Sequence, residues 1–203
     1  MRHLFTFLLI VVIAVPSFAL IIITDGYSES VTLNDSEYLL MTGGGIGDLN
    51  LFYESSATIE GTSTLSEGSG GIWQLSLSGK SALDFSGGEV HQLSMNNCST
   101  AIISGGLIEE IWNYQHTQDP ECDHLQCTAE PRITIVYSGD LPRWSSVTNI
   151  LTGLWGSGES FSIQLHDVPD YSRVIENIQL QLIPEPATFV LLGVGALLLR
   201  KRR

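Results

Sequence analysis

The chain has few basic residues, and most of them lie at its two ends. Of nine Lys and Arg among 203 residues, four close the sequence as Arg200, Lys201, Arg202 and Arg203, and Arg2 opens it. Between residues 20 and 183 only four basic residues stand against 21 acidic ones, a formal net charge of −17 for that stretch. Binding to nucleic acid needs clustered cations that release counterions from the phosphates. The charge distribution therefore excludes nucleic acid as an expected partner.

Cysteine is also rare, and two of the three cysteines lie close together. Cys122 and Cys127 fall in the segment HTQDPECDHLQC, whereas Cys98 lies upstream. If the chain is exported, as its N-terminus indicates below, the default expectation is a Cys122–Cys127 disulfide that leaves Cys98 odd. The alternative is a zinc or copper site formed by His116, Cys122, His124 and Cys127, although their spacing matches no standard zinc module. We expect the disulfide, and no metal or cofactor.

The sequence lacks a catalytic signature. It contains no G-x-S-x-G motif. Glycan-cleaving enzymes need clustered carboxylates, with calcium or Arg or at a fixed separation from each other. Four acidic residues are candidates only by composition, and in so acidic a chain we interpret them as solvated surface: Asp84, Glu89, Glu109 and Glu110. We therefore expect that the protein is not an enzyme.

Residues 1–19 have the three regions of a secretory signal peptide. Arg2 and His3 form a short positive region, residues 4–15 are apolar, and Ser17, Phe18 and Ala19 form a small-x-small cleavage site. We expect cleavage after Ala19. The alternative is an uncleaved anchor, because residues 20–23 extend the apolar run toward the ~20 residues that span a bilayer.

Residues 184–203 form a three-part tail. Pro184, Glu185 and Pro186 are followed by an apolar or small-residue stretch, 187–199, and then by the basic cluster 200–203. A helix of that length would be roughly 20 Å long, which is short for a hydrocarbon core of about 30 Å. The cations would hold the segment on the cytoplasmic side as a stop-transfer element while the body is exported. The alternative is an ordinary tail-anchor helix.

This ending, IPEPATFVLLGVGALLLRKRR, resembles the PEP-CTERM sorting signal of Gram-negative bacteria that make extracellular polysaccharide. The resemblance implies that a membrane cysteine transpeptidase, an exosortase, recognises Pro184, Glu185 and Pro186 and removes the helix. It also implies transient contact with the membrane and the secretion machinery, and delivery to the cell surface or its matrix. Because that family shares a tail and not a function, the resemblance implies no role for the body, residues 20–183.

An 18-residue repeat organises the body. Each copy has two pairs of apolar or small residues, with the members of a pair two positions apart, and ends on a glycine. The spacing from Gly43 to Gly61 is 18, and from Gly87 to Gly105 it is 18 again. In four copies the first and second pairs are Val31/Leu33 with Leu39/Met41, Leu49/Leu51 with Ala57/Ile59, Leu75/Leu77 with Leu83/Phe85, and Leu93/Met95 with Ala101/Ile103. Another apolar residue lies three positions before the first pair of the following copy, at Ile46, Ile72, Val90 and Ile108.

Two insertions interrupt the repeat. The spacing from Gly61 to Gly87 is 26, which is one period plus the eight loop-like residues TSTLSEGS, 62–69. A later copy ends at Gly139, with Ile135 and Tyr137 at the paired positions. The spacing from Gly105 to Gly139 is 34, which predicts a 16-residue insertion at about 114–130.

The repeat predicts an all-β fold, a parallel β-solenoid (β-helix) of about five 18-residue turns. Residues at i and i+2 on a strand share a face, so each pair would point inward, and turns must stack to bury such rows. We expect residues 153–168 and 177–184 to cap the last turn. The competing interpretation is an antiparallel sandwich, which also has short alternating strands.

Small polar residues and two tryptophans are predicted on the outside of this stack. Thr32, Asn50, Ser76 and Ser94 lie between paired apolar residues. Trp112 falls between inward positions 111 and 113, and Trp73 lies outward two turns earlier with His91 between them. Exposed aromatic rings can stack on sugar faces. Trp73 and Trp112 are therefore candidate glycan contacts, with core or cap packing as the alternative role.

Together these features predict an exported surface or biofilm-matrix protein of structural or adhesive character in a Gram-negative bacterium. Extracellular polysaccharide is the candidate partner. The alternative functions are a carbohydrate-binding module and, third, a small glycan-degrading enzyme.

Overall fold

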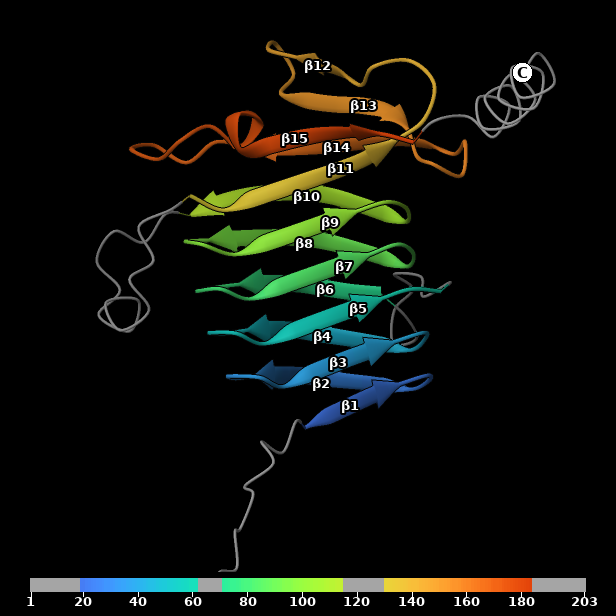
Figure 1. The fold of residues 1–203 in the computed structure, drawn as a ribbon, viewed down its shortest axis with the longest axis vertical. Coiled ribbons are helices and arrows are strands. Elements are labelled where there is room, and N and C mark those ends of the chain that lie inside the picture. Colours follow the sequence, from blue (N-terminus) through green and yellow to red (C-terminus); the bar gives the residue numbers. More distant parts are fainter. Residues whose placement is uncertain (1–18, 62–70, 115–129, 184–203) are drawn as a thin grey trace, which may run out of the picture.

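The computed structural model describes residues 19–61, 71–114 and 130–183, and within them the protein is all-β (Figure 1). From β1 to β12 successive strands alternate between two facing sheets, so the chain rises through the molecule, whereas β12, β13 and β14 follow one another in the same sheet. The seven-stranded sheet contains β1 (Leu20–Ile23), β3 (Tyr38–Met41), β5 (Ser56–Ile59), β7 (Ala82–Phe85), β9 (Thr100–Ile103), β11 (Arg132–Tyr137) and β15 (Ile178–Leu182).

The second sheet has eight strands and is mixed. Its order is β12 (Arg143–Ser145), β13 (Ile150–Leu154), β14 (Ser160–His166), β10 (Leu107–Tyr114), β8 (Glu89–Asn96), β6 (Gly71–Leu77), β4 (Gly45–Leu51) and β2 (Tyr27–Leu33). The pairs from β2 to β14 are parallel, whereas β12/β13 and β13/β14 are antiparallel. All pairs in the seven-stranded sheet are parallel.

The pairing follows the spacing of the sequence repeat through the first ten strands. Tyr38 pairs with Ser56, and Ile72 pairs with Val90, each with an offset of 18 in the sequence. Across the pairs β4/β6 and β5/β7 the offset is 26, as between Gly45 and Gly71. Equivalent positions of successive copies are therefore hydrogen-bonded neighbours.

The prediction for the fifth copy is wrong by two positions. Ile133 pairs with Ala101 and Ile135 with Ile103, an offset of 32, so the insertion is two residues shorter than the glycine spacing predicts. The reason is the length of the strand, because β11 has six residues where β3, β5, β7 and β9 have four. The glycine that follows β11, Gly139, comes two positions later and does not mark the repeat.

Rows of apolar side chains from both sheets form one core. The inward positions that the repeat predicts in β3 to β10 are all buried, among them Leu49, Leu75 and Leu93 in one row of the eight-stranded sheet. Burying each such side chain contributes about 1.5–3 kcal/mol. In β2, by contrast, Val31 is only half-buried, because β2 is the edge strand and has no further strand beside it.

The glycines that end each copy lie where successive turns come closest. At Gly43, Gly61, Gly87 and Gly105 an added Cβ would lie well under 3.0 Å from the carbonyl oxygen of the residue one turn earlier. No real Cβ atom tolerates that contact with backbone. Glycine therefore recurs at this corner because the stacked backbones leave no room for a side chain.

The two segments expected to cap the last turn cover the edges of β10 and β11, and they do so by continuing the two sheets. β14 continues the eight-stranded sheet in parallel with β10, and β15 continues the seven-stranded sheet in parallel with β11. β12 and β13 then form the end of the eight-stranded sheet. A 3-10 helix, η2 (Val174–Asn177), precedes β15. The buried Asn113 amide donates to the Ser172 carbonyl and hydroxyl oxygens at 3.2 and 3.0 Å, which ties β10 to this last turn.

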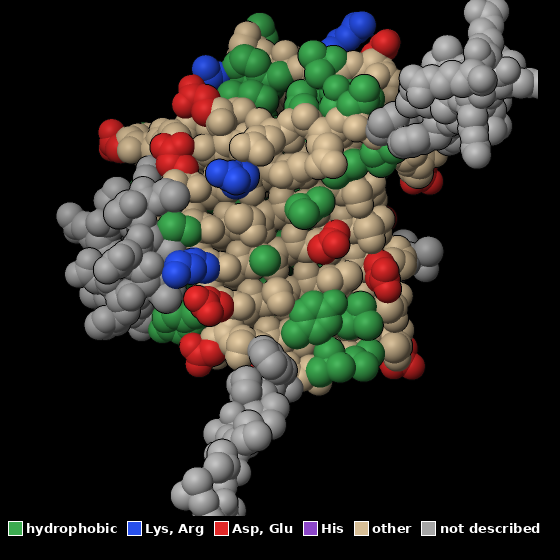
Figure 2. All heavy atoms as spheres, in the orientation of Figure 1, with side chains coloured by type: hydrophobic (Ala, Val, Ile, Leu, Met, Phe, Trp, Pro, Cys, Tyr) green, Lys and Arg blue, Asp and Glu red, His purple; other side chains and the backbone are tan. Residues whose placement is uncertain are grey.

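Figure 2 looks onto the seven-stranded sheet. Neutral polar side chains and backbone cover most of this face, and hydrophobic side chains gather toward its two ends. Its outward strand positions are residues such as Thr58, Asp84 and Ile102. The tryptophans and histidines of the parallel strands lie on the other sheet.

Candidate functional site

The outer face of the eight-stranded sheet presents two adjacent outward residues in each of three neighbouring strands. The inward residues Ile72 and Leu75 of β6 are three positions apart rather than two, and β8 and β10 repeat this spacing. The two residues between each such pair therefore both lie on the outer face of the sheet. Because Gln74, Gln92 and Glu110 pair across the strands, the residues before them also fall in one row, namely Trp73, His91 and Glu109.

The first half of the site is a stack that ends on a carboxylate. The Trp73 ring lies on the His91 ring, with centroids 4.2 Å apart and an interplanar angle of 24°. His91 Nδ1 lies 2.7 Å from Glu109 Oε2. Trp73 is 59% exposed, so one face of the indole is open to solvent while the imidazole supports the other. The ring lies outside the core, where the repeat places it.

The second half of the site is a stack of three rings, from Trp112 and Tyr114 on β10 and His166 on β14. The Trp112 ring lies parallel to that of His166 at 4.1 Å, and also to that of Tyr114 at 5.9 Å. Trp112 Nε1 donates to Glu110 Oε2 at 2.9 Å, and His166 Nε2 is 3.5 Å from the same oxygen. Partial burial raises the pKa of the Tyr114 phenol above its ordinary value. We call these residues, Trp73, His91, Glu109, Glu110, Trp112, Tyr114 and His166, the outer strip.

One predicted surface position is buried in this region. Ser94, expected outside, is only 4% exposed. It pairs with Trp112 in the sheet, and its hydroxyl accepts a hydrogen bond from Gln92 Nε2 at 3.0 Å. Larger neighbours on the same face cover it, which alternation along one strand cannot reveal. Ser76, one strand away, remains half-exposed.

The acidic candidates do not converge on a catalytic geometry. Asp84 lies on β7 of the other sheet, and Glu109 and Glu110 are consecutive residues of one strand whose Oε2 atoms are engaged by His91 and Trp112. Glu89 begins β8, two residues before His91. Flat rings beside carboxylate groups form a surface on which a polar, ring-shaped ligand can pack.

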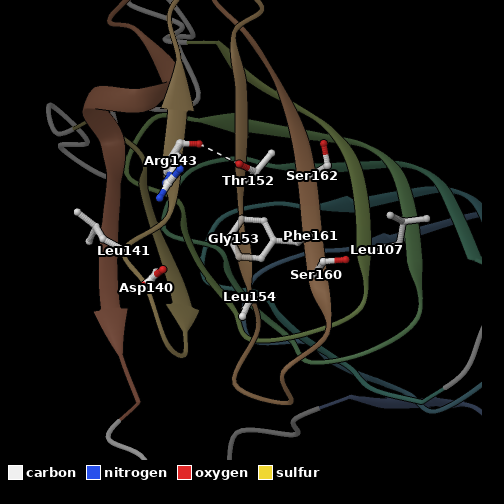
Figure 3. Close-up of a pocket in the computed structure, with 10 residues that line it drawn as sticks. All are labelled: Leu107, Asp140, Leu141, Arg143, Thr152, Gly153, Leu154, Ser160, Phe161 and Ser162. Atoms are coloured by element: carbon white, nitrogen blue, oxygen red, sulfur yellow. Dashed lines mark hydrogen bonds between the residues drawn. The ribbon is translucent and has the colours of Figure 1, made fainter.

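A groove of about 600 Å³ lies at the C-terminal end (Figure 3). Leu107, Leu141 and Leu154 contribute exposed apolar area to it, and Asp140 and Arg143 are its charged residues. Gly153 makes room for the Phe161 ring, because a Cβ there would lie 2.6 Å from Phe161 Cζ. None of the residues that the sequence suggested lines this groove, which brings β10, β13 and β14 together with the segment after β11.

Several predicted residues lie outside the part of the chain that the structure describes. They are the motif Pro184, Glu185 and Pro186, the basic cluster 200–203, the Cys122–Cys127 pair, and the alternative metal ligands His116 and His124. Cys98 is described and is a half-buried free thiol. Within residues 19–61, 71–114 and 130–183, no three His, Cys, Asp or Glu side chains gather as metal ligands. In the same ranges, no helix has the length and apolarity needed to cross a membrane.

Comparisons of this chain with protein-family models, curated proteins and solved structures find no match.

Proposed function

We propose that the body is a parallel β-solenoid. Strands that alternate between two sheets, parallel pairing from β1 to β11, and a constant offset of 18 between most successive copies support this assignment. An antiparallel sandwich would instead pair its strands antiparallel, and among the described strands only β12 with β13 and β13 with β14 pair in that way.

The function we propose is that of an exported, non-catalytic matrix or cell-surface protein that adheres to polysaccharide. The signal peptide at 1–19 and the tail at 184–203 support export and sorting by an exosortase, by way of the secretion machinery and transient membrane contact. Carboxylates held by ring donors, rather than set opposite one another, support a binding role over glycan cleavage.

One observation carries the adhesive part of the proposal. On the outer strip an indole, half-open to solvent, lies beside a second stack and next to carboxylate and amide groups on a continuous sheet face. Sugar rings have apolar faces that pack on indole and hydroxyl edges that hydrogen-bond to such polar groups. A parallel sheet repeats these positions about every 4.8 Å, so the face suits an extended chain better than a single sugar.

We predict that Trp73→Ala weakens polysaccharide binding by about tenfold, since loss of one stacking ring costs on the order of 1–1.5 kcal/mol. The measurement is affinity electrophoresis of the full chain through gels that contain the extracellular polysaccharide of the producing cells. Ile102→Ala is the matched control, because Ile102 is also exposed, at 48%, but on the seven-stranded sheet. Equal retardation of both variants and the unchanged chain would exclude the outer strip as the binding face.

We predict also that the mature protein lacks both ends. The signal peptide, residues 1–19, and the tail from residue 187 onward should be absent from protein recovered from the cell exterior. Intact-mass spectrometry of material from the native host measures this directly. A dominant species that retains residues 191–203 would argue against removal of the tail.

A further inference from the structure

The outer strip carries negative charge without any fixed positive charge. Strands β2, β4, β6, β8, β10 and β14 contain five carboxylates, Glu29, Asp48, Glu89, Glu109 and Glu110, and not one Lys or Arg. Lys80 follows β6 in the turn beyond it, where its Nζ lies 3.9 Å from Glu54. Two Arg side chains lie at the C-terminal end of this sheet, Arg143 on β12 and Arg173, whose Nε is 3.6 Å from Asp167 Oδ2. Along the outer strip itself, a ligand with carboxylate or sulfate groups would meet repulsion from Glu109 and Glu110.

Two of these carboxylates lie beside the rings that would hold a sugar. Glu109 is next to the Trp73–His91 stack and its side chain is 46% exposed, whereas Glu110 lies under Trp112 Nε1 with 30% exposed. In each carboxylate one oxygen, Oε2, is hydrogen-bonded to a ring nitrogen, that of His91 for Glu109 and that of Trp112 for Glu110. A carboxylate has about four acceptor sites, so each retains acceptor capacity toward solvent.

We infer that the outer strip selects a polysaccharide with free amino groups, such as a partly N-deacetylated hexosamine polymer. This inference rests on the proposed polysaccharide binding and specifies its ligand. Glu109 lies beyond His91 from Trp73, so its carboxylate would meet an ammonium group on another sugar of a chain that continues from Trp73 across β8 and β10. Neutral sugars gain only the stacking, and acidic sugars lose by repulsion.

The test compares three oligosaccharides of equal length with the full chain at pH 7.0 by isothermal titration calorimetry. A glucosamine hexamer, its N-acetylated counterpart and an oligogalacturonate hexamer differ in charge and share a chain of six-membered sugar rings. We expect the glucosamine hexamer to bind about tenfold more tightly than the acetylated one at low salt, and this preference to shrink in 0.5 M NaCl.

The variants separate charge from stacking. The double variant Glu109→Gln/Glu110→Gln should bring the preference close to one while binding of the acetylated hexamer is unchanged. Asp84→Asn, which removes one exposed charge from the seven-stranded sheet, should change neither. Trp73→Ala should weaken both hexamers equally. Equal affinity for the first two hexamers, or tightest binding of the acidic one, would overturn the inference and leave the proposed adhesion standing. No binding of any hexamer at millimolar concentration would overturn both.

Discussion

Leu75→Asp is expected to leave the chain unfolded. Leu75 is fully buried in β6, between Leu49 on one side and Leu93 on the other. The substitution removes a core side chain, which alone costs about 2–5 kcal/mol, and places a carboxylate where no cation can neutralise it. An unpaired buried charge adds about 3–5 kcal/mol, and the sum reaches the ~5–15 kcal/mol by which domains are stable. Circular dichroism should show loss of the β signal.

Ser76→Asp is the matched control. Ser76 is the next residue on the same strand, faces outward and is half-exposed, so the added charge remains hydrated. A surface substitution of this kind changes the free energy of unfolding by roughly 0.5 kcal/mol. If both variants unfold, or both fold, the assignment of inward and outward positions along β6 is wrong.

Gly105→Ala is expected to lower the free energy of unfolding by about 2–3 kcal/mol. Gly105 does not have a left-handed backbone, so alanine is acceptable in its dihedral angles, but its Cβ would meet the Ser86 carbonyl oxygen. The contact is with backbone of the neighbouring turn, so relief requires the two turns to separate, and overpacking of this kind typically costs about 1–3 kcal/mol. Thermal denaturation should show a midpoint lower by about 4–10 °C.

Gly156→Ala is the matched control, because Gly156 does not lie at a repeat corner. Gly156 also lies outside the left-handed region, but the atom nearest to its added Cβ is the Ile183 Cδ1, the end of a flexible side chain. That side chain can turn away, so the midpoint should change by no more than about 2 °C. A similar loss of stability in both variants would contradict the close approach of turns at the repeat corner.

The sequence was sufficient for the part of the fold that depends on regular spacing. Because strands alternate with period two and the copies have constant length, spacing alone assigns residues such as Leu49, Leu75 and Leu93 to one inward row. The same spacing placed Trp73, His91 and Trp112 on one face. The geometry of the ring stacks, and the engagement of Glu109 and Glu110 by them, depends on side-chain rotamers that spacing does not determine.

The errors arose where spacing ceased to be regular. The longer strand β11 shifted the register of the fifth copy by two positions, and burial of Ser94 depends on Gln92 and Trp112 from its own sheet face. β14 pairs with β10 although Trp112 and His166 lie far apart in the chain, so no local pattern marked the continuation of the sheet. The groove near Arg143 combines three such distant segments and had no signal in the sequence.

A crystal structure of the protein with a bound hexosamine hexasaccharide tests the central claim most directly. We predict a sugar ring packed on the open face of the Trp73 indole, with the chain continuing across β8 and β10 and a nitrogen of the ligand within about 3 Å of a Glu109 carboxylate oxygen. A ligand seated instead in the groove between Leu141 and Phe161, without contact to Trp73, would contradict the account.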